Sequence, residues 1–129
     1  MSFNPSQVRA FLSRQRFALA GVKRNGEGFG NKVLQHMLQK GYEVIPIHPQ
    51  AEEIGGVRCY PSLIELPVAV EGLILVVPPD QAEVLVRQAD IVGIRRIWMQ
   101  PGVESEDLLA YCDERCLEVI HDACLLQLA

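Results

Sequence analysis

The chain has 129 residues, the size of one ordinary domain, and its 49% hydrophobic and 22% charged residues are typical of a globular protein rather than a disordered one. The net charge of −4 leaves no broad basic face, which argues against duplex nucleic acid as a partner. The apolar runs are too short to span a bilayer and no secretory signal is apparent, so we expect a cytoplasmic protein with no membrane partner.

The first half of the chain alternates amphipathic and short apolar segments. Asn4-Pro5 has the pattern of a helix start, an N-cap residue followed by proline. Pro46 indicates a position near the end of a strand, because proline cannot donate a ladder hydrogen bond. After the first helix, the pattern predicts a strand over 17–20, a helix over 29–40 and a strand over 42–47.

The second half continues the alternation after a longer excursion over 50–70. That excursion is predicted to contain a turn at Gly55-Gly56 and a short helix after Pro61. Asp80 is predicted to cap a helix that reaches about Ile91. The remaining predicted elements are strands over 73–77, 95–99 and 117–120, and a helix capped by Ser105 between the last two.

Strand and helix thus alternate along the whole chain, with crossovers of roughly a dozen residues or more, the length that a parallel connection needs. The pattern predicts an α/β protein: one Rossmann-type domain over 1–129, a three-layer, doubly wound, mostly parallel five-stranded sheet with helices on both faces. Ligands of such sheets bind outside the carboxyl ends of the strands. The candidate site therefore comprises the loops over 21–28, 48–49, 78–79, 100–103 and 121–124.

The loop after the first strand carries the strongest ligand signal. Glycines at 21, 26, 28 and 30 let the backbone approach a ligand closely, and the following helix directs its positive N-terminus to the same place. Lys23, Arg24 and Lys32 add three cations against the single acid Glu27. This local excess in an acidic chain predicts binding of a phosphate or pyrophosphate.

Two familiar nucleotide sites do not fit this loop. It has no GxxxxGK[ST] sequence, and its glycines lack the spacing of a dinucleotide fingerprint. His48-Pro49 stands where an NAD site would carry an acid for the ribose. Lys23 and Arg24 could accept a 2′-phosphate, so a small NADP-dependent oxidoreductase or redox sensor remains the alternative. An interaction domain with a vestigial groove is a third interpretation.

The four cysteines suggest neither a metal site nor catalysis. Cys112, Cys116 and Cys124, together with His121, could be drawn as a zinc set, but the predicted helix and strand through this stretch favour packed cysteines instead. No nucleophile with a base and an orienting group can be named, so we predict no catalytic residues and no metal. Trp98 and the apolar C-terminal tail suggest a homodimer.

Several motifs occur in a characteristic order: GFGNKV, GYEVIPIHP, VVPP and WMQPG. With them the chain resembles the small CoA-binding proteins of the Rossmann type, whose domain is similar to the N-terminal domain of the succinyl-CoA synthetase alpha subunit. The likeness covers nearly the whole chain. It implies a coenzyme A site at the carboxyl edge of the sheet, and a protein that binds CoA or acyl-CoA as a carrier, sensor or partner-dependent module without catalytic machinery of its own.

The resemblance also implies a role for each candidate site residue. Lys23 stands in place of an expected small hydroxyl residue, and His48 in place of an expected asparagine. Cys124 could face the CoA thiol and exchange disulfides, or it could simply be a buried cysteine at a strand end. By the resemblance, Gly21, Val22, Lys23 and Arg24 would cradle phosphates, with Phe29, Gly30 and Lys32 at the helix start; His48 and Pro49 would flank the nucleotide; Val77, Pro78 and Pro79 would line the groove; and Gln100 and Gly102 would approach the pantetheine end.

Overall fold

The computed structural model describes residues 3–50 and 52–129. Its helices are α1 (Pro5–Leu12), α2 (Phe29–Gln39), α3 (Pro79–Val92), α4 (Glu106–Glu114) and α5 (Leu125–Leu128). Its strands are β1 (Arg16–Ala20), β2 (Glu43–Ile47), β3 (Glu53–Ile54), β4 (Val57–Arg58), β5 (Gly72–Leu75), β6 (Arg96–Met99) and β7 (Glu118–Ile120).

Five strands form one parallel sheet in the order β2-β1-β5-β6-β7. The predicted Rossmann-type α/β fold is thereby confirmed. The chain runs outward from β1 to β2 and then returns to β5 on the other side of β1, so the order reverses between β1 and β5. This reversal is where doubly wound sheets open a crevice at the carboxyl ends of their strands. Pro46 lies in the edge strand β2, where a missing backbone donor is tolerated.

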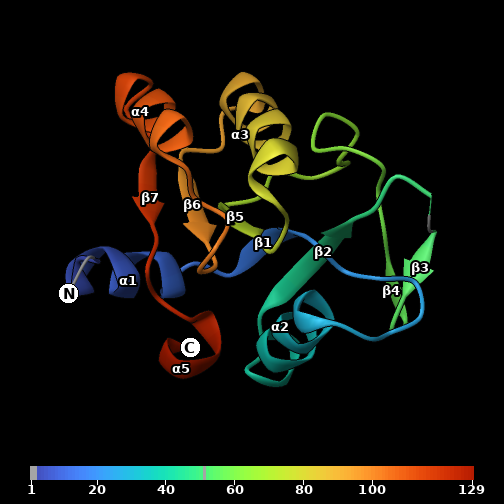
Figure 1. Cartoon of the computed structure of the whole chain (residues 1–129). Coiled ribbons are helices and arrows are strands. Elements are labelled where there is room, and N and C mark those ends of the chain that lie inside the picture. Colours follow the sequence, from blue (N-terminus) through green and yellow to red (C-terminus); the bar gives the residue numbers. More distant parts are fainter. Residues whose placement is uncertain (1–2, 51) are drawn as a thin grey trace.

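Helices cover both faces of this sheet, giving three layers (Figure 1). Alternate residues of each strand face opposite ways, so β1 sends Phe17 and Leu19 into one core and Ala18 and Ala20 into the other. The first core packs against α1, α2 and α5, and the second against α3 and α4. Trp98 is fully buried in the first core, where its ring meets that of Phe11 edge-on. It therefore cannot contribute to a dimer surface.

Two local predictions were wrong. The segment after Pro61 makes only isolated turns, with Glu65 N–H donating to Ser62 O at 3.3 Å, and no helix forms there within the described residues. Pro67 follows at once and prevents helical continuation. Asp80 is not a cap: Pro78 is the N-cap of α3 and Pro79 takes its first position, where the fixed φ of proline suits the helix.

Three short elements were absent from the sequence-based prediction. The turn at Gly55-Gly56 is confirmed, and it joins β3 to β4 as a small antiparallel pair. The tail forms α5, which packs Leu125 into the core beside α2. None of the helices in residues 3–50 and 52–129 combines the length and apolar character needed to cross a lipid bilayer.

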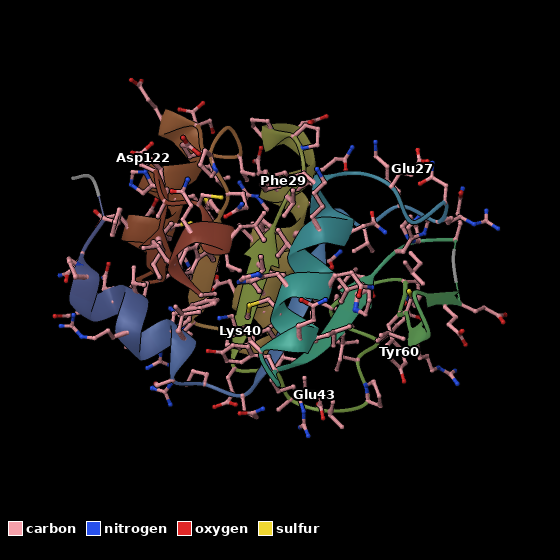
Figure 2. The ribbon with its side chains drawn as sticks, turned by 90° about the horizontal axis from the view of Figure 1, so that it is seen from below. Glu27, Phe29, Lys40, Glu43, Tyr60 and Asp122 are labelled. Carbon is pink, nitrogen blue, oxygen red and sulfur yellow. The ribbon has the colours of Figure 1, made fainter. Side chains whose placement is uncertain are left out.

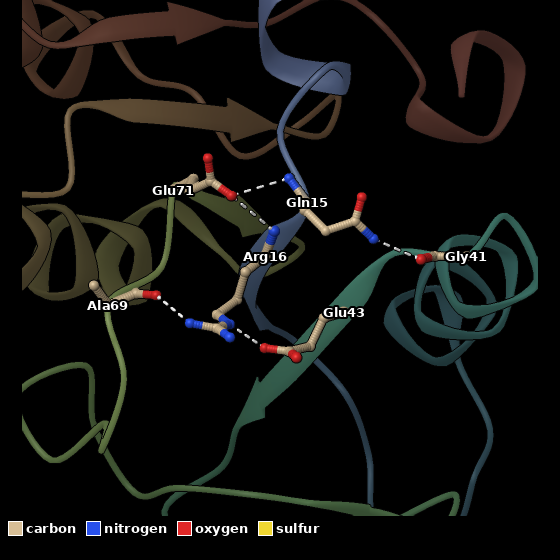
Figure 3. Close-up of polar contacts among 6 residues, drawn as sticks. All are labelled: Gln15, Arg16, Gly41, Glu43, Ala69 and Glu71. Atoms are coloured by element: carbon tan, nitrogen blue, oxygen red, sulfur yellow. Dashed lines mark hydrogen bonds and ion pairs between the residues drawn. The ribbon is translucent and has the colours of Figure 1, made fainter.

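Polar contacts tie the strands together at the amino edge of the sheet (Figure 3). The Glu71 carboxylate accepts hydrogen bonds from the backbone N–H groups of Gln15 at 3.0 Å and Arg16 at 3.2 Å. These two donors hold the pKa of Glu71 below its usual range. The Arg16 guanidinium in turn pairs with Glu43 of β2 and donates to Ala69 O at 3.3 Å. This edge is closed by its own side chains, in contrast to the carboxyl edge.

Candidate functional site

The loops at the carboxyl ends of the strands meet along one side of the molecule. Figure 2 shows Glu27, Phe29 and Asp122 along this edge, with Lys40 and Glu43 at the opposite one. Glu27 and Phe29 belong to the connection from β1 to α2, and Asp122 follows β7. The structure thus places the predicted site loops at one edge, as a parallel sheet requires.

Within residues 3–50 and 52–129, two cavities lie at this edge on either side of the end of β5, and a third, of about 490 Å³, lies beside β3 and β4 and shares His48 and Pro49. The β2-side cavity, about 550 Å³, lies between the ends of β1 and β2 and the start of α3. The β6-side cavity, about 470 Å³, lies between α2, β5, β6 and the segment before α5. Val77 lines both cavities, so they lie next to each other, and the pair is called the groove below. Cavities of this size are typical of small-molecule and cofactor sites.

Most of the predicted site residues line this groove. The β2-side cavity takes Gly21, Val22, His48, Pro49 and Val77, and the β6-side cavity takes Phe29, Val77, Pro78, Gln100 and Gly102. Of the other predicted residues, all within the described part of the chain, none lines either cavity; they are Lys23, Arg24, Gly30, Lys32 and Pro79.

Two glycines let three backbone segments pack together at the head of the groove. Gly21 has a φ of +117°, and a Cβ there would lie 2.2 Å from Val76 O. A Cβ on Gly30 would lie 2.2 Å from Gly21 O. The loop after β1 is therefore wedged between the end of β5 and the first turn of α2. Both glycines are required by this packing, whatever the groove binds.

Asn31 fixes the next part of the same loop. Its side chain is buried in the first turn of α2, where Oδ1 accepts the Lys23 N–H at 2.8 Å and Nδ2 donates to Lys23 O at 3.0 Å. The sequence analysis missed this residue. The available signal was an asparagine inside the first turn of a predicted helix, because asparagine there tends to bond to nearby backbone.

The three predicted phosphate-binding cations do not converge. The aliphatic part of Lys23 lies over Gly28, with its Cδ 3.3 Å from where a Gly28 Cβ would be. Arg24 is exposed on the same loop. Lys32 instead lines a separate cavity of about 390 Å³ on the outer side of α2, together with His36. Lys23 and Arg24 are thus beside the groove, whereas Lys32 faces away from it.

At the end of β2, His48 lines the β2-side cavity, and its Nδ1 accepts the Gln50 N–H at 3.0 Å. This contact is part of the turn that leads the chain away from the strand. Pro49 lines the same cavity. A planar group in this cavity would lie beside the imidazole and pyrrolidine rings of these two residues.

The far end of the groove is closed by the C-terminal segment, which a buried amide holds in place. Gln100, only 2% exposed, accepts hydrogen bonds through Oε1 from Trp98 Nε1 at 3.1 Å and from Leu125 N–H at 2.8 Å. Trp98 Nε1 also donates to Ala123 O at 3.1 Å. Because the carbonyl oxygen takes both donors, the amide nitrogen is directed toward Cys124, with Nε2 3.7 Å from Sγ.

The other titratable groups that the sequence singled out lie away from the groove. His121 Nδ1 is 3.0 Å from Asp122 Oδ2, and neither residue lines the two cavities. Cys112 lies on the buried face of α4, where burial raises its pKa to about 11. Burial likewise raises the pKa of Cys59. Over residues 3–50 and 52–129, no three His, Cys, Asp or Glu residues are grouped as metal ligands would be.

Known proteins with similar sequences were found by a family comparison and among curated relatives. A family described as CoA binding domain matches residues 15–128. The uncharacterized protein YneT of Bacillus subtilis (strain 168) is 28% identical over 134 residues, covering 95% of this chain and 93% of its own. The acetate–CoA ligase (ADP-forming) II of Archaeoglobus fulgidus is 30% identical over 116 residues, which cover 87% of this chain but only 17% of the ligase.

A solved structure has the same fold as this chain. A conserved hypothetical protein from Pyrococcus furiosus superposes with a TM-score of 0.83 at 34% identity, covering 88% of this chain and 97% of that one. The similarity therefore extends over the sheet and its loops as a unit.

Proposed function

Because the chain belongs to the CoA-binding domain family, we propose that it binds coenzyme A in the groove at the carboxyl edge of the sheet. The observation that carries the proposal is that two cavities at this edge meet at Val77, which lines both of them. A long, bent ligand with a bulky nucleotide at one end and a narrow arm at the other fits such a groove better than a compact one does.

The phosphates of CoA would lie at the loop after β1. The first backbone N–H groups of α2 have no partner within the helix, and Gly28 as N-cap has no side chain to satisfy them. Together with the helix dipole, they favour an anion at this point. Lys23 and Arg24 supply the positive charge, while Gly21, Val22 and Gly30 keep the backbone close. Lys32, on the outer side of α2, would contribute only its positive charge to the electrostatic potential around the phosphates.

The nucleoside end would then lie in the β2-side cavity, against His48 and Pro49. The pantetheine arm would pass Val77, Pro78 and Pro79 and enter the β6-side cavity, where Gln100 and Gly102 face its end. Six residues of that cavity wall have apolar side chains (Phe29, Val76, Val77, Pro78, Pro101 and Val103), which suits an arm with long methylene segments.

The biological role that we propose is a CoA or acyl-CoA carrier, sensor or partner-dependent module acting in the cytoplasm. The acetate–CoA ligase of Archaeoglobus fulgidus is an enzyme, and the match to this chain covers 17% of its length. Ligase chemistry would therefore depend on the parts of the ligase that these 129 residues do not match.

Calorimetric titration of the purified protein with CoA, acetyl-CoA, NAD, NADP and ATP tests the proposal. We expect binding of CoA in preference to the other nucleotides. Binding of NADP alone would overturn the proposal in favour of the oxidoreductase alternative, and no binding at all would favour an interaction domain.

The placement of the phosphates has its own test. Lys23→Ala with Arg24→Ala should weaken CoA binding about 10- to 100-fold, because one charge-assisted contact is worth about 1.5–3 kcal/mol. The matched control is Lys40→Ala, an exposed cation at the opposite edge of the molecule (Figure 2). Equal affinities of the double variant and the control would contradict the placement.

A further inference from the structure

The end of the β6-side cavity combines a thiol with a buried amide. Among the residues that line this cavity, Cys124 and Gln100 have the polar side chains. Cys124 is half-buried and free, and it is the residue that precedes α5. The sheet ends, the first turn of α2 and the C-terminal segment all converge on this point.

The amide of Gln100 has an unused donor. Its Nε2 carries two N–H bonds, and within residues 3–50 and 52–129 its single partner is Cys124 Sγ at 3.7 Å. The side chain cannot turn to use the other N–H elsewhere, because Oε1 is held by Trp98 and by the backbone of Leu125. Sulfur is a weak acceptor, so this amide leaves an N–H at the end of the cavity for a stronger acceptor on a ligand beside the thiol.

We propose that Cys124 forms a reversible mixed disulfide with coenzyme A bound in this groove, an inference that rests on the proposed function. The co-reactant is CoA disulfide. With one half of CoA disulfide bound, the Cys124 thiolate attacks the sulfur of that half. A Cys124–CoA disulfide forms, the original S–S bond breaks, and the second CoA leaves as a thiolate that solvent protonates. A thiol entering the groove reverses the exchange.

The positions of the other cysteines make this exchange selective. Cys59 and Cys112 are buried, and burial raises the pKa of both thiols, which keeps them from acting as nucleophiles. Cys116 is exposed but precedes β7, so it lies at the amino edge of the sheet, away from the groove. Of the four cysteines, Cys124 lines the β6-side cavity, which the pantetheine arm would enter, whereas Cys59 lines a separate cavity beside β3 and β4. Binding would hold the two sulfur atoms together and accelerate their exchange.

The experiment treats the reduced protein with CoA disulfide and, separately, with glutathione disulfide, and locates the adducts by peptide mass spectrometry. We expect the CoA adduct on Cys124 to form at least about tenfold faster than the glutathione adduct there, and faster than any adduct on Cys116. Saturating acetyl-CoA, whose thiol is capped, should slow the CoA reaction at Cys124 and leave that at Cys116 unchanged.

Two variants complete the test. Cys124→Ser should bind CoA reversibly in calorimetry but form no adduct at that position, while Cys116→Ser should behave as the wild type at Cys124. CoA binding without a Cys124 adduct, or equal rates for the two disulfides, would overturn this inference and leave the proposed function standing. Failure of CoA to bind the reduced wild-type protein would instead overturn the proposed function, and this inference with it.

Discussion

The side chain of Asn31 holds the backbone of Lys23 by two hydrogen bonds, one to its N–H at 2.8 Å and one to its carbonyl oxygen at 3.0 Å. Lys23 O also accepts the Gly26 N–H at 3.1 Å. A residue of α2 thus fixes the shape of the loop after β1. A loop held by such contacts loses less conformational entropy on binding, so in the proposed CoA site we expect Asn31 to support affinity without touching the ligand.

Replacing Asn31 with alanine should therefore affect both stability and binding. Two hydrogen bonds of a buried side chain are lost, and the free energy of unfolding should fall by about 1–3 kcal/mol. CoA affinity should fall as well, because the loop must then be ordered upon binding. Urea unfolding and calorimetry measure the two effects, with Gln39→Ala on the exposed side of α2 as the control. Unchanged CoA affinity in Asn31→Ala would show that the loop does not need this support.

The position of Val77 between the two cavities predicts that a larger side chain there will weaken CoA binding. Val77 is half-buried and lines both cavities, so Val77→Trp should fill the junction between them. We expect at least a tenfold loss of CoA affinity, about 1.4 kcal/mol, with a small change in thermal unfolding because the site is open to solvent. Ile91→Trp, an exposed position on α3, provides the control. If Val77→Trp bound CoA as tightly as the wild type, the ligand would not cross this junction.

The sequence predicted the sheet, its helices and most of the groove because periodicity and glycine placement are local signals. The strands around Phe17 and Ile74 are short apolar runs, and the loops that follow them had to meet at one edge of a parallel sheet. The amphipathic helices of nine residues or more, α2, α3 and α4, could likewise be predicted from the spacing of their apolar residues.

The rest depended on contacts between distant residues. Nothing near Trp98 and Gln100 in the sequence predicts that Ala123 and Leu125 will close the cavity, because each of these contacts joins residues 25 positions apart. Lys32 looked like part of the phosphate site because it is close in sequence, but the turn of α2 directs it to another side. The direction of a side chain such as Lys32 depends on how the helix is rotated about its axis against the sheet, and the local composition of the loop does not give that rotation.

The four cysteines should differ widely in their reaction with iodoacetamide. Cys116 is exposed and should be alkylated quickly in the folded protein. Cys112 is 1% exposed and its pKa is raised to about 11 by burial, so its alkylation should wait for unfolding. Timed labelling followed by peptide mass spectrometry measures the order, with a urea-denatured sample as the control in which all four react alike. Rapid labelling of Cys112 under native conditions would indicate that α4 opens readily.

Asp90 predicts how stability depends on pH. Its side chain is 8% exposed, and its carboxylate receives Arg95 Nη1 at 2.7 Å, Arg115 Nε at 2.8 Å and the Tyr111 hydroxyl at 3.2 Å. Burial by itself raises the pKa of Asp90, but the hydrogen bonds from Arg95 and Arg115 outweigh it and hold the pKa below its ordinary value. The folded state therefore favours the charged carboxylate more than the unfolded chain does.

In the unfolded chain the pKa of Asp90 is about 3.9, and above that pH its contribution to stability is fully present. The contribution is lost as the pH falls through the lower pKa that Asp90 has in the folded protein. Asp90→Asn should unfold at a lower urea concentration than the wild type at pH 7, and the difference should shrink toward pH 3. Asp113→Asn, an exposed aspartate on α4, controls for the change in net charge. If the gap between Asp90→Asn and the wild type stayed constant from pH 7 to pH 3, Asp90 would stabilise the α3–α4 pair through packing rather than through its charge.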